Sequence, residues 1–553
     1  MPPSTTLRDE ALDRDRLQTL AAALQAGRYK AATAQAEAML ADGLIHPLPL
    51  RMAATVRQRA GRFEEAIALF QRITQLAPRE PAGWAALSDC QFAARRPEAA
   101  LEANQAALNL APDEPSLLCA RAQILRSLSR IGEASALFQR ALAANPDLFE
   151  AQMGLAMLAV EAGDWTEAAG LVRGLRARHG PSPATGWLAA RIAMGLREFE
   201  AAREEIAEVL ADPHLQSDQR AEALLLQGEA LDALDRPAEA FDAAVAGKAI
   251  QHQLFSERAA GREGETAKLT RLARWFQTAD RETWRRSTDA PALSDDAARH
   301  VFLFGFPRSG TTLLEQVLAG HPDVVALEEA PTLAAPYAEF MTTDEGLERL
   351  ARLTPAEIDL WRARYWAEVR GHGVEPRDRL FVDKAPAGTL YLPLVAKLFP
   401  EAKVLFALRD PRDVVLSCLR QSFQLNAMTY AFTTLDEAAR CYAACMGLAE
   451  VYRAVLPLRL LQVRHENLVQ DFDAGLTQIA GFLGLTVTPE MADVGATARR
   501  RVVRTPSATQ VREGVNTRGV GRWRAYAEQL GPVVKTLAPW VERFGYALEG
   551  LDG

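Results

Sequence analysis

The segment 305–312, Gly-Phe-Pro-Arg-Ser-Gly-Thr-Thr, has residue types and a spacing suited to holding an anion. It follows an apolar run at 301–304, typical of a buried strand, and leads into a helical pattern. A glycine loop between a strand and a helix points backbone N–H groups and the positive end of the helix at one anion. Its glycine spacing is that of an ATP-binding phosphate loop, but Thr311 stands where such a loop has lysine. We therefore predict a phosphate-bearing nucleotide, held with the help of Arg308, and disfavour ATP hydrolysis.

In the second half of the chain, strand patterns alternate with helical patterns, and this alternation predicts the elements that position the loop. Four more strand-like segments, at 324–327, 379–386, 403–408 and 458–463, alternate with helical patterns. Such alternation predicts a parallel sheet, whose ligands bind at the carboxyl ends of the strands. Polar residues suited to catalysis or anion binding follow these strand ends, namely Arg308, Glu329, Lys384, Arg409 and Ser417.

The first half is an internal repeat. Alanine recurs every 34 residues, at Ala32, Ala66, Ala100, Ala134, Ala168 and Ala202, and resumes at Ala240 after an insertion. Three units close on a proline, at Pro78, Pro112 and Pro146. The period resembles the tetratricopeptide repeat, in which two short helices pack closely at a small residue and proline ends the second. We predict a helical solenoid that presents an acceptor protein or peptide to the second half, with homodimer formation as the alternative.

The motifs of the second half resemble those of sulfotransferases, which use 3′-phosphoadenosine 5′-phosphosulfate (PAPS). The loop 305–312 is similar to their 5′-phosphosulfate loop, and 408–417 to their 3′-phosphate motif, an arginine after a strand and a serine eight residues later. The segments 321–329 and 381–386 are similar to those of tyrosylprotein sulfotransferases. Bacterial fusions of tetratricopeptide repeats to such a domain form a recognised family, which the whole chain resembles.

The resemblance implies a role for each matching residue. Glu329 would be the general base, while Lys384 and Arg308 would stabilise the transferred sulfuryl group. The positions that match donor-binding residues are Arg308, Ser309, Gly310, Thr311, Thr312, Arg409, Ser417, Ser507, Arg518 and Gly519. Two departures bear on the acceptor rather than on PAPS, since Glu513 stands where the tyrosylprotein enzymes have lysine and His465 where they have tyrosine.

Three residues compete with Glu329 as the base. Glu328 is adjacent to it, and His321 and His465 are candidates because other sulfotransferases use histidine. His321, between a glycine and a proline, suits the end of a helix, and we expect His465 near the adenine or the loop.

Composition narrows the class of protein. The net charge of −8, without a dominant basic face, gives no reason to expect a nucleic-acid partner. Five cysteines without CxxC pairs favour core packing over metal binding, so no metal is expected. The chain shows neither a signal peptide nor an apolar stretch of membrane-spanning length, so a cytoplasmic location away from the membrane is expected.

The sequence thus predicts a multidomain protein. An N-terminal all-α tetratricopeptide-repeat solenoid is expected at 15–255, a helical linker at 256–298, and an α/β, P-loop-like sulfotransferase domain with a parallel sheet at 299–553. The predicted reaction is sulfuryl transfer from PAPS to a hydroxyl, best a protein tyrosine, leaving adenosine 3′,5′-bisphosphate. The alternatives are glycan or small-molecule acceptors, a repeat scaffold with a catalytically degenerate nucleotide domain, and, least favoured, a P-loop kinase.

Overall fold

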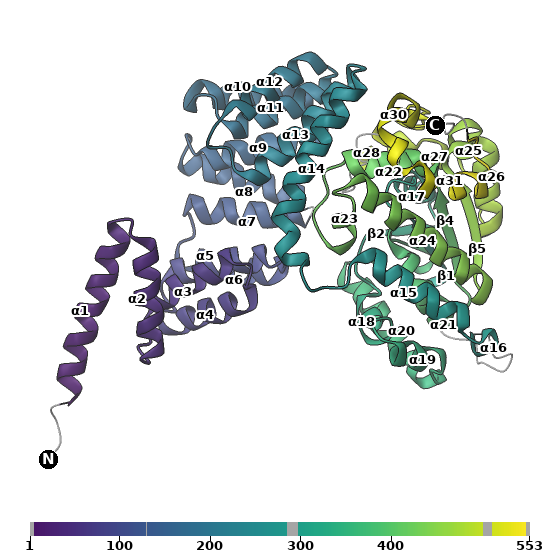
Figure 1. Cartoon of the computed structure of the whole chain (residues 1–553). Coiled ribbons are helices and arrows are strands. Elements are labelled where there is room, and N and C mark those ends of the chain that lie inside the picture. The colour runs from purple at the N-terminus through teal and green to yellow at the C-terminus, as the bar shows by residue number, and fades with distance from the viewer. Residues whose placement is uncertain (1–4, 129, 285–296, 502–510, 549–553) are drawn as a thin grey trace. The chain divides into compact units, whose positions relative to one another are not determined.

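The computed structural model describes residues 5–128, 130–284, 297–501 and 511–548 (Figure 1). The chain forms two compact units, Met1–Glu205 and Ile206–Gly553.

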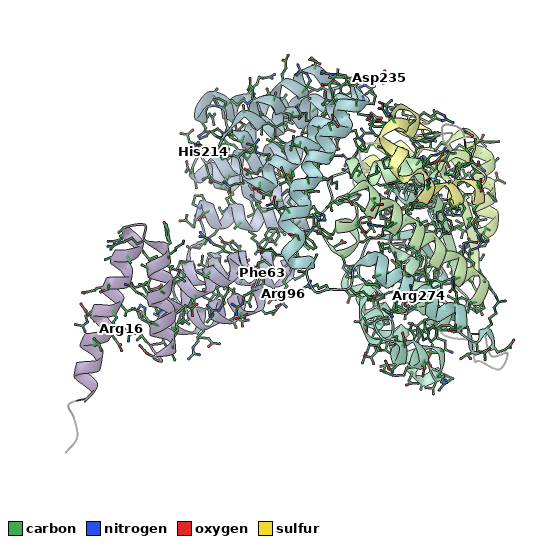
Figure 2. The ribbon with its side chains drawn as sticks, viewed as in Figure 1. Arg16, Phe63, Arg96, His214, Asp235 and Arg274 are labelled. Carbon is green, nitrogen blue, oxygen red and sulfur yellow. The ribbon has the colours of Figure 1, made fainter. Side chains whose placement is uncertain are left out.

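The first unit consists of helices joined by short turns. Their bounds are α1 (Thr5–Gln25), α2 (Tyr29–Ala41), α3 (Pro47–Arg59), α4 (Phe63–Leu76), α5 (Pro81–Ala93), α6 (Pro97–Leu110), α7 (Pro115–Ser127), α8 (Ile131–Ala144), α9 (Phe149–Ala162), α10 (Trp165–His179), α11 (Pro183–Leu196) and α12 (Phe199–Ala211), the last of which crosses the boundary between the units. Side chains of neighbouring repeats meet at the surface as well, since Arg96, labelled in Figure 2, pairs with Glu64 at 2.5 Å.

The recurring alanines occupy equivalent places in these helices. Each lies in the second helix of its pair and is fully buried, as the repeat pattern requires: Ala32, Ala66, Ala100, Ala134, Ala168, Ala202 and Ala240. The three repeat-closing prolines each follow the end of a second helix, for example Pro78 after α4. The predicted tetratricopeptide-type helical array is therefore confirmed.

Close packing between repeats predicts a specific sensitivity at Gly154 in α9. A Cβ atom there would lie 2.3 Å from the Phe138 ring, which is itself fully buried in α8. We expect Gly154→Ala to lower the free energy of unfolding by about 1–3 kcal/mol, because the ring must leave its preferred position. Urea denaturation followed by circular dichroism measures this change.

Gly170 in α10 is the matched control for that substitution. A Cβ atom at Gly170 would meet no heavy atom within 4 Å in the described structure, its own helix aside. Alanine is the better helix former, so Gly170→Ala should leave stability unchanged or raise it by up to about 1 kcal/mol. Equal effects of the two substitutions would contradict the packing argument.

The second unit contains the sheet and its covering helices. Its helices are α13 (Ser217–Ala233), α14 (Pro237–Ala259), α15 (Glu265–Thr278), α16 (Arg281–Trp284), α17 (Thr311–Ala319), α18 (Ala334–Phe340), α19 (Asp344–Ala351), α20 (Pro355–Gly371), α21 (Leu392–Leu398), α22 (Pro411–Arg420), α23 (Ala427–Ala431), α24 (Leu435–Val455), α25 (His465–Gln470), α26 (Phe472–Leu483), α27 (Pro489–Ala492), α28 (Val494–Arg500), α30 (Ala527–Leu530) and α31 (Val534–Arg543). The helix pair α13–α14, which carries the last repeat alanine, thus lies in this unit. The predicted domain limits at 255 and 298 stay a prediction.

Five parallel strands form one sheet. They are β1 (Ala297–Gly305), β2 (Val324–Glu328), β3 (Arg377–Lys384), β4 (Lys403–Leu408) and β5 (Arg459–Arg464), in the order β2-β3-β1-β4-β5. All five predicted strands are present, so the predicted α/β class with a parallel sheet is confirmed. In this sheet β3 lies between β2 and β1, so the carboxyl ends of these three strands are neighbours. The residues that follow the three strands therefore come together.

The sheet is buried on both faces, which explains its continuous apolar strands. Successive side chains of a strand point to opposite faces. Phe302 and Phe304 of β1 accordingly belong to one core, with α20 and α24, and Val301 and Leu303 to the other, with α17 and α26. Among the described residues, no helix is both long and apolar enough to cross a membrane.

Candidate active site

The loop after β1 is shaped by close backbone approaches. A Cβ atom on Gly305 would lie 2.8 Å from the carbonyl oxygen of Ala407, and one on Gly310 the same distance from Nδ1 of His465. Gly310 has φ +99° and precedes the first residue of α17, while Arg308 also adopts a positive φ, of 70°. A non-glycine residue in this region is uncommon and costs about 1–3 kcal/mol, and such residues cluster at functional sites. The loop therefore holds Arg308 in a constrained position beside the positive end of a helix.

Arg308, Arg409 and Ser417 lie together, although they come from three separate elements. Nε of Arg308 donates to Oγ of Ser417 at 2.9 Å, and Nη1 of Arg409 donates to the carbonyl oxygen of Arg308 at 3.1 Å. Burial, followed by the neighbouring Arg409 guanidinium, lowers the pKa of Arg308 to about 10. The two neighbouring guanidinium groups repel each other, and an anion bound between them would relieve that repulsion.

The glycine-rich segment near the C-terminus is fixed to the same region. Nη2 of Arg409 donates to the carbonyl oxygen of Gly519, and the Asp413 carboxylate accepts from the N–H groups of Gly521 and Trp523 at 2.7 and 2.8 Å. Nε of Arg409 is buried and finds no acceptor within the described structure. A buried donor of this kind needs a partner, and an anionic ligand would supply one.

Lys384, at the end of β3, is surrounded by carboxylates. Its Nζ lies 2.8 Å from Glu329, 3.2 Å from Glu328 and 3.3 Å from Glu315 of α17, and its side chain is fully buried. Burial alone would lower the pKa of Lys384, but the three carboxylates, Glu315 first, outweigh burial and raise it. The structure therefore holds Lys384 as a cation within this cluster, where Arg501 lies 3.4 Å from Glu315.

Glu329 differs from its competitors in where it lies. It follows β2 with φ +50°, its N–H donates to the carbonyl oxygen of Lys384 at 2.8 Å, and its side chain is 43% exposed. His321 accepts a hydrogen bond from the N–H of Asp323 and is buried at the end of α17, as a helix stop should be. Burial, followed by the charge of Arg409, lowers the pKa of His465 to about 3, and that ring lies against the loop. Among the four candidate bases, Glu329 is the one that lines the cavity described next.

A cavity of about 400 Å³ connects the loop with Glu329. The lining includes Arg308, Gly310, Thr311, Thr312 and Glu329, all of which were predicted as site residues from the sequence. It also includes apolar and aromatic side chains, namely Tyr337, Leu390, Tyr391, Phe423 and Met428. Apolar lining of this kind suits a flat or apolar acceptor.

Several lining residues were not predicted from the sequence. Glu265 and Lys268 of α15 form an ion pair at 2.8 Å and line the cavity, yet they fall in the segment predicted to be a linker. Tyr337 and Tyr391 pack edge to face with ring centroids 5.6 Å apart. Their spacing in the sequence carries no signal, because only the fold brings these side chains to one cavity.

The remaining predicted donor-site residues are placed as follows. Ser309 is buried in the loop, and its N–H donates to the carbonyl oxygen of Phe306 at 3.1 Å. The Arg518 guanidinium is exposed and pairs with Glu513, so the structure does not bring it to the cavity lining, although Gly519 next to it contacts Arg409. Ser507 lies outside the described residues.

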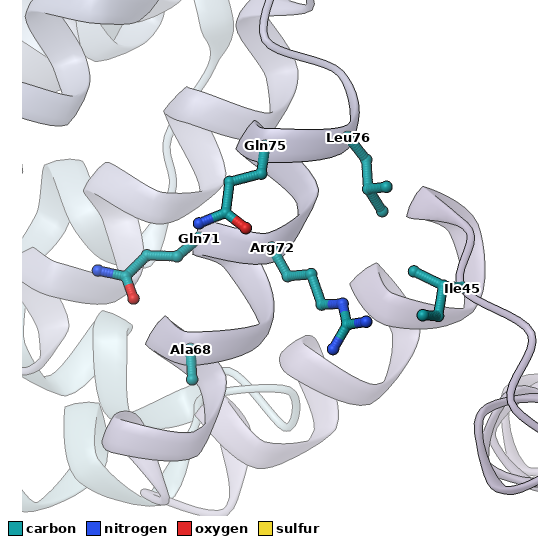
Figure 3. Close-up of a pocket in the computed structure, with 6 residues that line it drawn as sticks. All are labelled: Ile45, Ala68, Gln71, Arg72, Gln75 and Leu76. Carbon is teal, nitrogen blue, oxygen red and sulfur yellow. The ribbon is translucent and has the colours of Figure 1, made fainter.

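The repeats of the first unit contain a second hollow, a groove of about 590 Å³ (Figure 3). It is lined by Ile45, Ala68, Gln71, Arg72, Gln75 and Leu76. Among these six residues Arg72 is the one ionisable side chain, so the lining offers a cation without a carboxylate or imidazole to act as a base. We therefore place the candidate chemistry in the cavity above the loop.

Comparison with known proteins agrees with this placement. Residues 300–489 match the sulfotransferase family, and residues 58–124 and 119–183 match tetratricopeptide repeats. A putative protein-tyrosine sulfotransferase of Caenorhabditis briggsae is 25% identical over 44% of this chain and 88% of its own length. An uncharacterized protein of Aquifex aeolicus is 27% identical over 43% of this chain, but this chain spans only 32% of its length.

One solved structure in the comparison shares the sulfotransferase description. The sulfotransferase domain of the Synechococcus PCC 7002 olefin synthase is 26% identical, covers 47% of this chain and 99% of its own, and has a TM-score of 0.33. The matched segments and the two motifs within them indicate the family instead. The chain therefore carries tetratricopeptide repeats followed by a sulfotransferase-family domain that is distantly related to protein-tyrosine sulfotransferases.

Proposed function

We propose that the second unit transfers a sulfuryl group from PAPS to an acceptor hydroxyl, with protein tyrosine as the best single acceptor. The observation that supports this most is the cavity in which the anion-binding loop and Glu329 face the same space, with Lys384 in contact with Glu329. A cation, a candidate base and an anion site at one cavity are the parts that group transfer to a hydroxyl requires.

The residues present fit the donor. Arg308 and the Thr311–Thr312 end of α17 would hold the 5′-phosphosulfate, and Arg409 with Ser417 the 3′-phosphate. Two features of the structure favour such an anion. One is the buried unpartnered Nε of Arg409, and the other is the Arg409 guanidinium beside Arg308, whose pKa is lowered by burial first and by this second cation next. Charge-assisted hydrogen bonds from arginine to phosphate are among the strongest polar contacts in proteins.

Each side chain has one task in the proposed reaction. When bound, PAPS supplies the sulfuryl group and the adenosine 3′,5′-bisphosphate leaving group. Glu329 takes the proton of the acceptor hydroxyl while the acceptor oxygen bonds to sulfur and the bond from sulfur to the bridging oxygen breaks. Lys384 and Arg308 neutralise the charge that develops on that bridging oxygen. No proton needs to reach the leaving group, because the two cations stabilise it as an anion.

The acceptor class is supported by the relatives and by the cavity wall. Several relatives are named protein-tyrosine sulfotransferases, and the rings of Tyr337, Tyr391 and Phe423 form an apolar wall against which a phenol could pack. A sugar hydroxyl would make less use of this wall. We also propose that the repeats hold the acceptor protein.

A binding experiment tests the donor assignment. Adenosine 3′,5′-bisphosphate should bind about tenfold to a hundredfold more tightly than AMP, because a charge-assisted contact to the 3′-phosphate contributes about 1.5–3 kcal/mol. Arg409→Ala should remove most of that difference. Isothermal titration calorimetry measures both nucleotides on both proteins, and equal affinity of the parent chain for the two nucleotides would remove the 3′-phosphate site.

A further inference from the structure

We infer that the helix pair α13–α14 positions one wall of the acceptor cavity, and that His252 and Lys248 are its positioning residues. The pair precedes the segment that matches the sulfotransferase family, residues 300–489, and carries the last repeat alanine. The inference rests on the proposed function only in calling this cavity the acceptor site. The catalytic machinery would then include a part of the repeat array.

The wall in question is the segment 421–433, between α22 and α24. Phe423 and residues 426–429 line the cavity. The segment contains only the five-residue helix α23, which Asn426 caps by accepting from the N–H groups of Met428 and Thr429. A stretch with so little regular structure depends on its neighbours for a fixed position.

Lys248 of α14 holds the start of this segment. Its side chain is fully buried, and Nζ donates to the carbonyl oxygen of Gln421, the C-cap of α22, at 2.7 Å. A cation is favourable at the C-terminal end of a helix, where unpaired carbonyl groups carry partial negative charge. The same ammonium lies 5.5 Å from the ring centroid of Phe423, which lines the cavity. One buried lysine therefore fixes both the end of α22 and a wall residue.

His252, one helical turn further along α14, holds the other end of the segment. Nδ1 lies 2.8 Å from Oγ1 of Thr433, Nε2 lies 3.1 Å from the hydroxyl of Tyr430, and the two rings stack 4.7 Å apart. Because Thr433 donates its own hydroxyl proton to the carbonyl oxygen of Tyr430, Nδ1 of His252 must be the donor to Thr433. Nε2 lies within hydrogen-bond distance of the Tyr430 hydroxyl, so both ring nitrogens have a partner in this segment.

Asp232 of α13 attaches the helix pair α13–α14 to the C-terminal end of α22. Its carboxylate pairs with Arg420, the last residue of α22, at 2.6 Å, and with Arg522 at 2.8 Å. Burial alone would raise the pKa of Asp232, but its partners, Arg420 first, outweigh burial and lower it. Both α13 and α14 thus contact the C-terminal end of α22, and Figure 1 shows α14 beside α23.

The test uses the full chain with His252→Ala and Lys248→Met. Hydrogen exchange of peptides covering 421–433 should become at least about tenfold faster in both variants, because the segment loses contacts that hold it closed. With PAPS and a synthetic peptide containing one tyrosine, the acceptor KM should rise about fivefold to tenfold. The dissociation constant of adenosine 3′,5′-bisphosphate should change less than about twofold, since the donor loop is not touched.

Two further variants separate positioning from a general loss of structure. Gln253→Ala changes an exposed neighbour of His252 on the same helix and should leave all three readouts unchanged. His252→Gln keeps one donor and one acceptor and should restore part of the acceptor KM. If Lys248→Met fails to fold, His252→Ala decides the question.

The outcomes distinguish this inference from the proposed function. Parental exchange rates of 421–433 in His252→Ala would overturn the inference, as would an acceptor KM and a donor affinity that worsen by the same factor. Failure of every variant and of the parent chain to sulfate the peptide would count against the proposed function, and the exchange rates would still decide the positioning role.

Discussion

Glu329→Gln is expected to reduce turnover by about 10²- to 10⁴-fold while leaving the affinity for adenosine 3′,5′-bisphosphate unchanged, because removal of a general base has an effect of this size. The glutamine amide keeps the size of the side chain and can still accept from Lys384, which lies 2.8 Å from the carboxylate. It cannot take the proton of an acceptor hydroxyl. Steady-state sulfation of a tyrosine peptide, together with calorimetry of the nucleotide, measures the two quantities separately.

Two control substitutions and a pH series sharpen that experiment. Glu328→Gln and His321→Ala change residues outside the cavity lining and should lower turnover much less. A dead His321→Ala beside an active Glu329→Gln would reassign the base. Raising the pH toward about 10, where tyrosine ionises, should partly rescue Glu329→Gln if the acceptor is a phenol. A sugar hydroxyl ionises far above this range, so the absence of rescue would favour a glycan acceptor.

The sequence predicted those parts of the site that short, local sequence patterns determine. The loop at 305–312 was recognisable because glycine, proline and threonine types are set by backbone geometry, and Gly310 does adopt φ +99°. The strands were recognisable because a parallel sheet with both faces covered needs continuous apolar runs. The sequence could also predict that Arg308, Arg409 and Ser417 lie close together, because each follows or adjoins the carboxyl end of a strand.

The parts that the sequence did not reveal depend on contacts between distant segments. Glu265 and Lys268 line the cavity only because α15 packs along α24, and nothing in the spacing of a single amphipathic helix says where it docks. The contact of Lys248 with Gln421 spans 173 residues, and neither residue belongs to a motif. Arg518 shows the opposite case. It belongs to a recognisable segment, but its side chain pairs with Glu513 at the surface.

The buried cluster around Lys384 could not be predicted for a related reason. Glu315 follows the loop in a helix whose pattern suggests core packing, and a glutamate there would ordinarily be expected at the surface. In the structure Glu315 is 1% exposed, with Lys384 on one side and Arg501 on the other. Burial raises the pKa of its carboxyl above the ordinary value in spite of Lys384. If Lys384 also stabilises the transferred group, as proposed above, stability and turnover should both depend on this one lysine.

This shared dependence leads to the second large effect, which is expected for Lys384→Met. Turnover should fall by about 10²- to 10³-fold, the size of effect seen when one group that stabilises transition-state charge is removed. Stability should also fall, by about 3–5 kcal/mol, because the substitution leaves Glu315 buried without its nearest cation. The kinetic loss should persist at high pH, unlike that of Glu329→Gln, since ionising the acceptor does not replace a cation at the bridging oxygen.

A double variant separates the two roles of Lys384. Glu315→Gln removes the buried charge that Lys384 would otherwise neutralise, so Lys384→Met with Glu315→Gln should regain most of the lost stability in urea denaturation. Turnover should stay low, because no cation has been returned beside Glu329. Recovery of turnover together with stability would mean that Lys384 acts only through folding, and the transition-state role would then have to pass to Arg308. Glu315→Gln alone, with Lys384 still paired to Glu328 and Glu329 at 3.2 and 2.8 Å, should retain activity and show that the cation, rather than its buried carboxylate partner, serves the reaction.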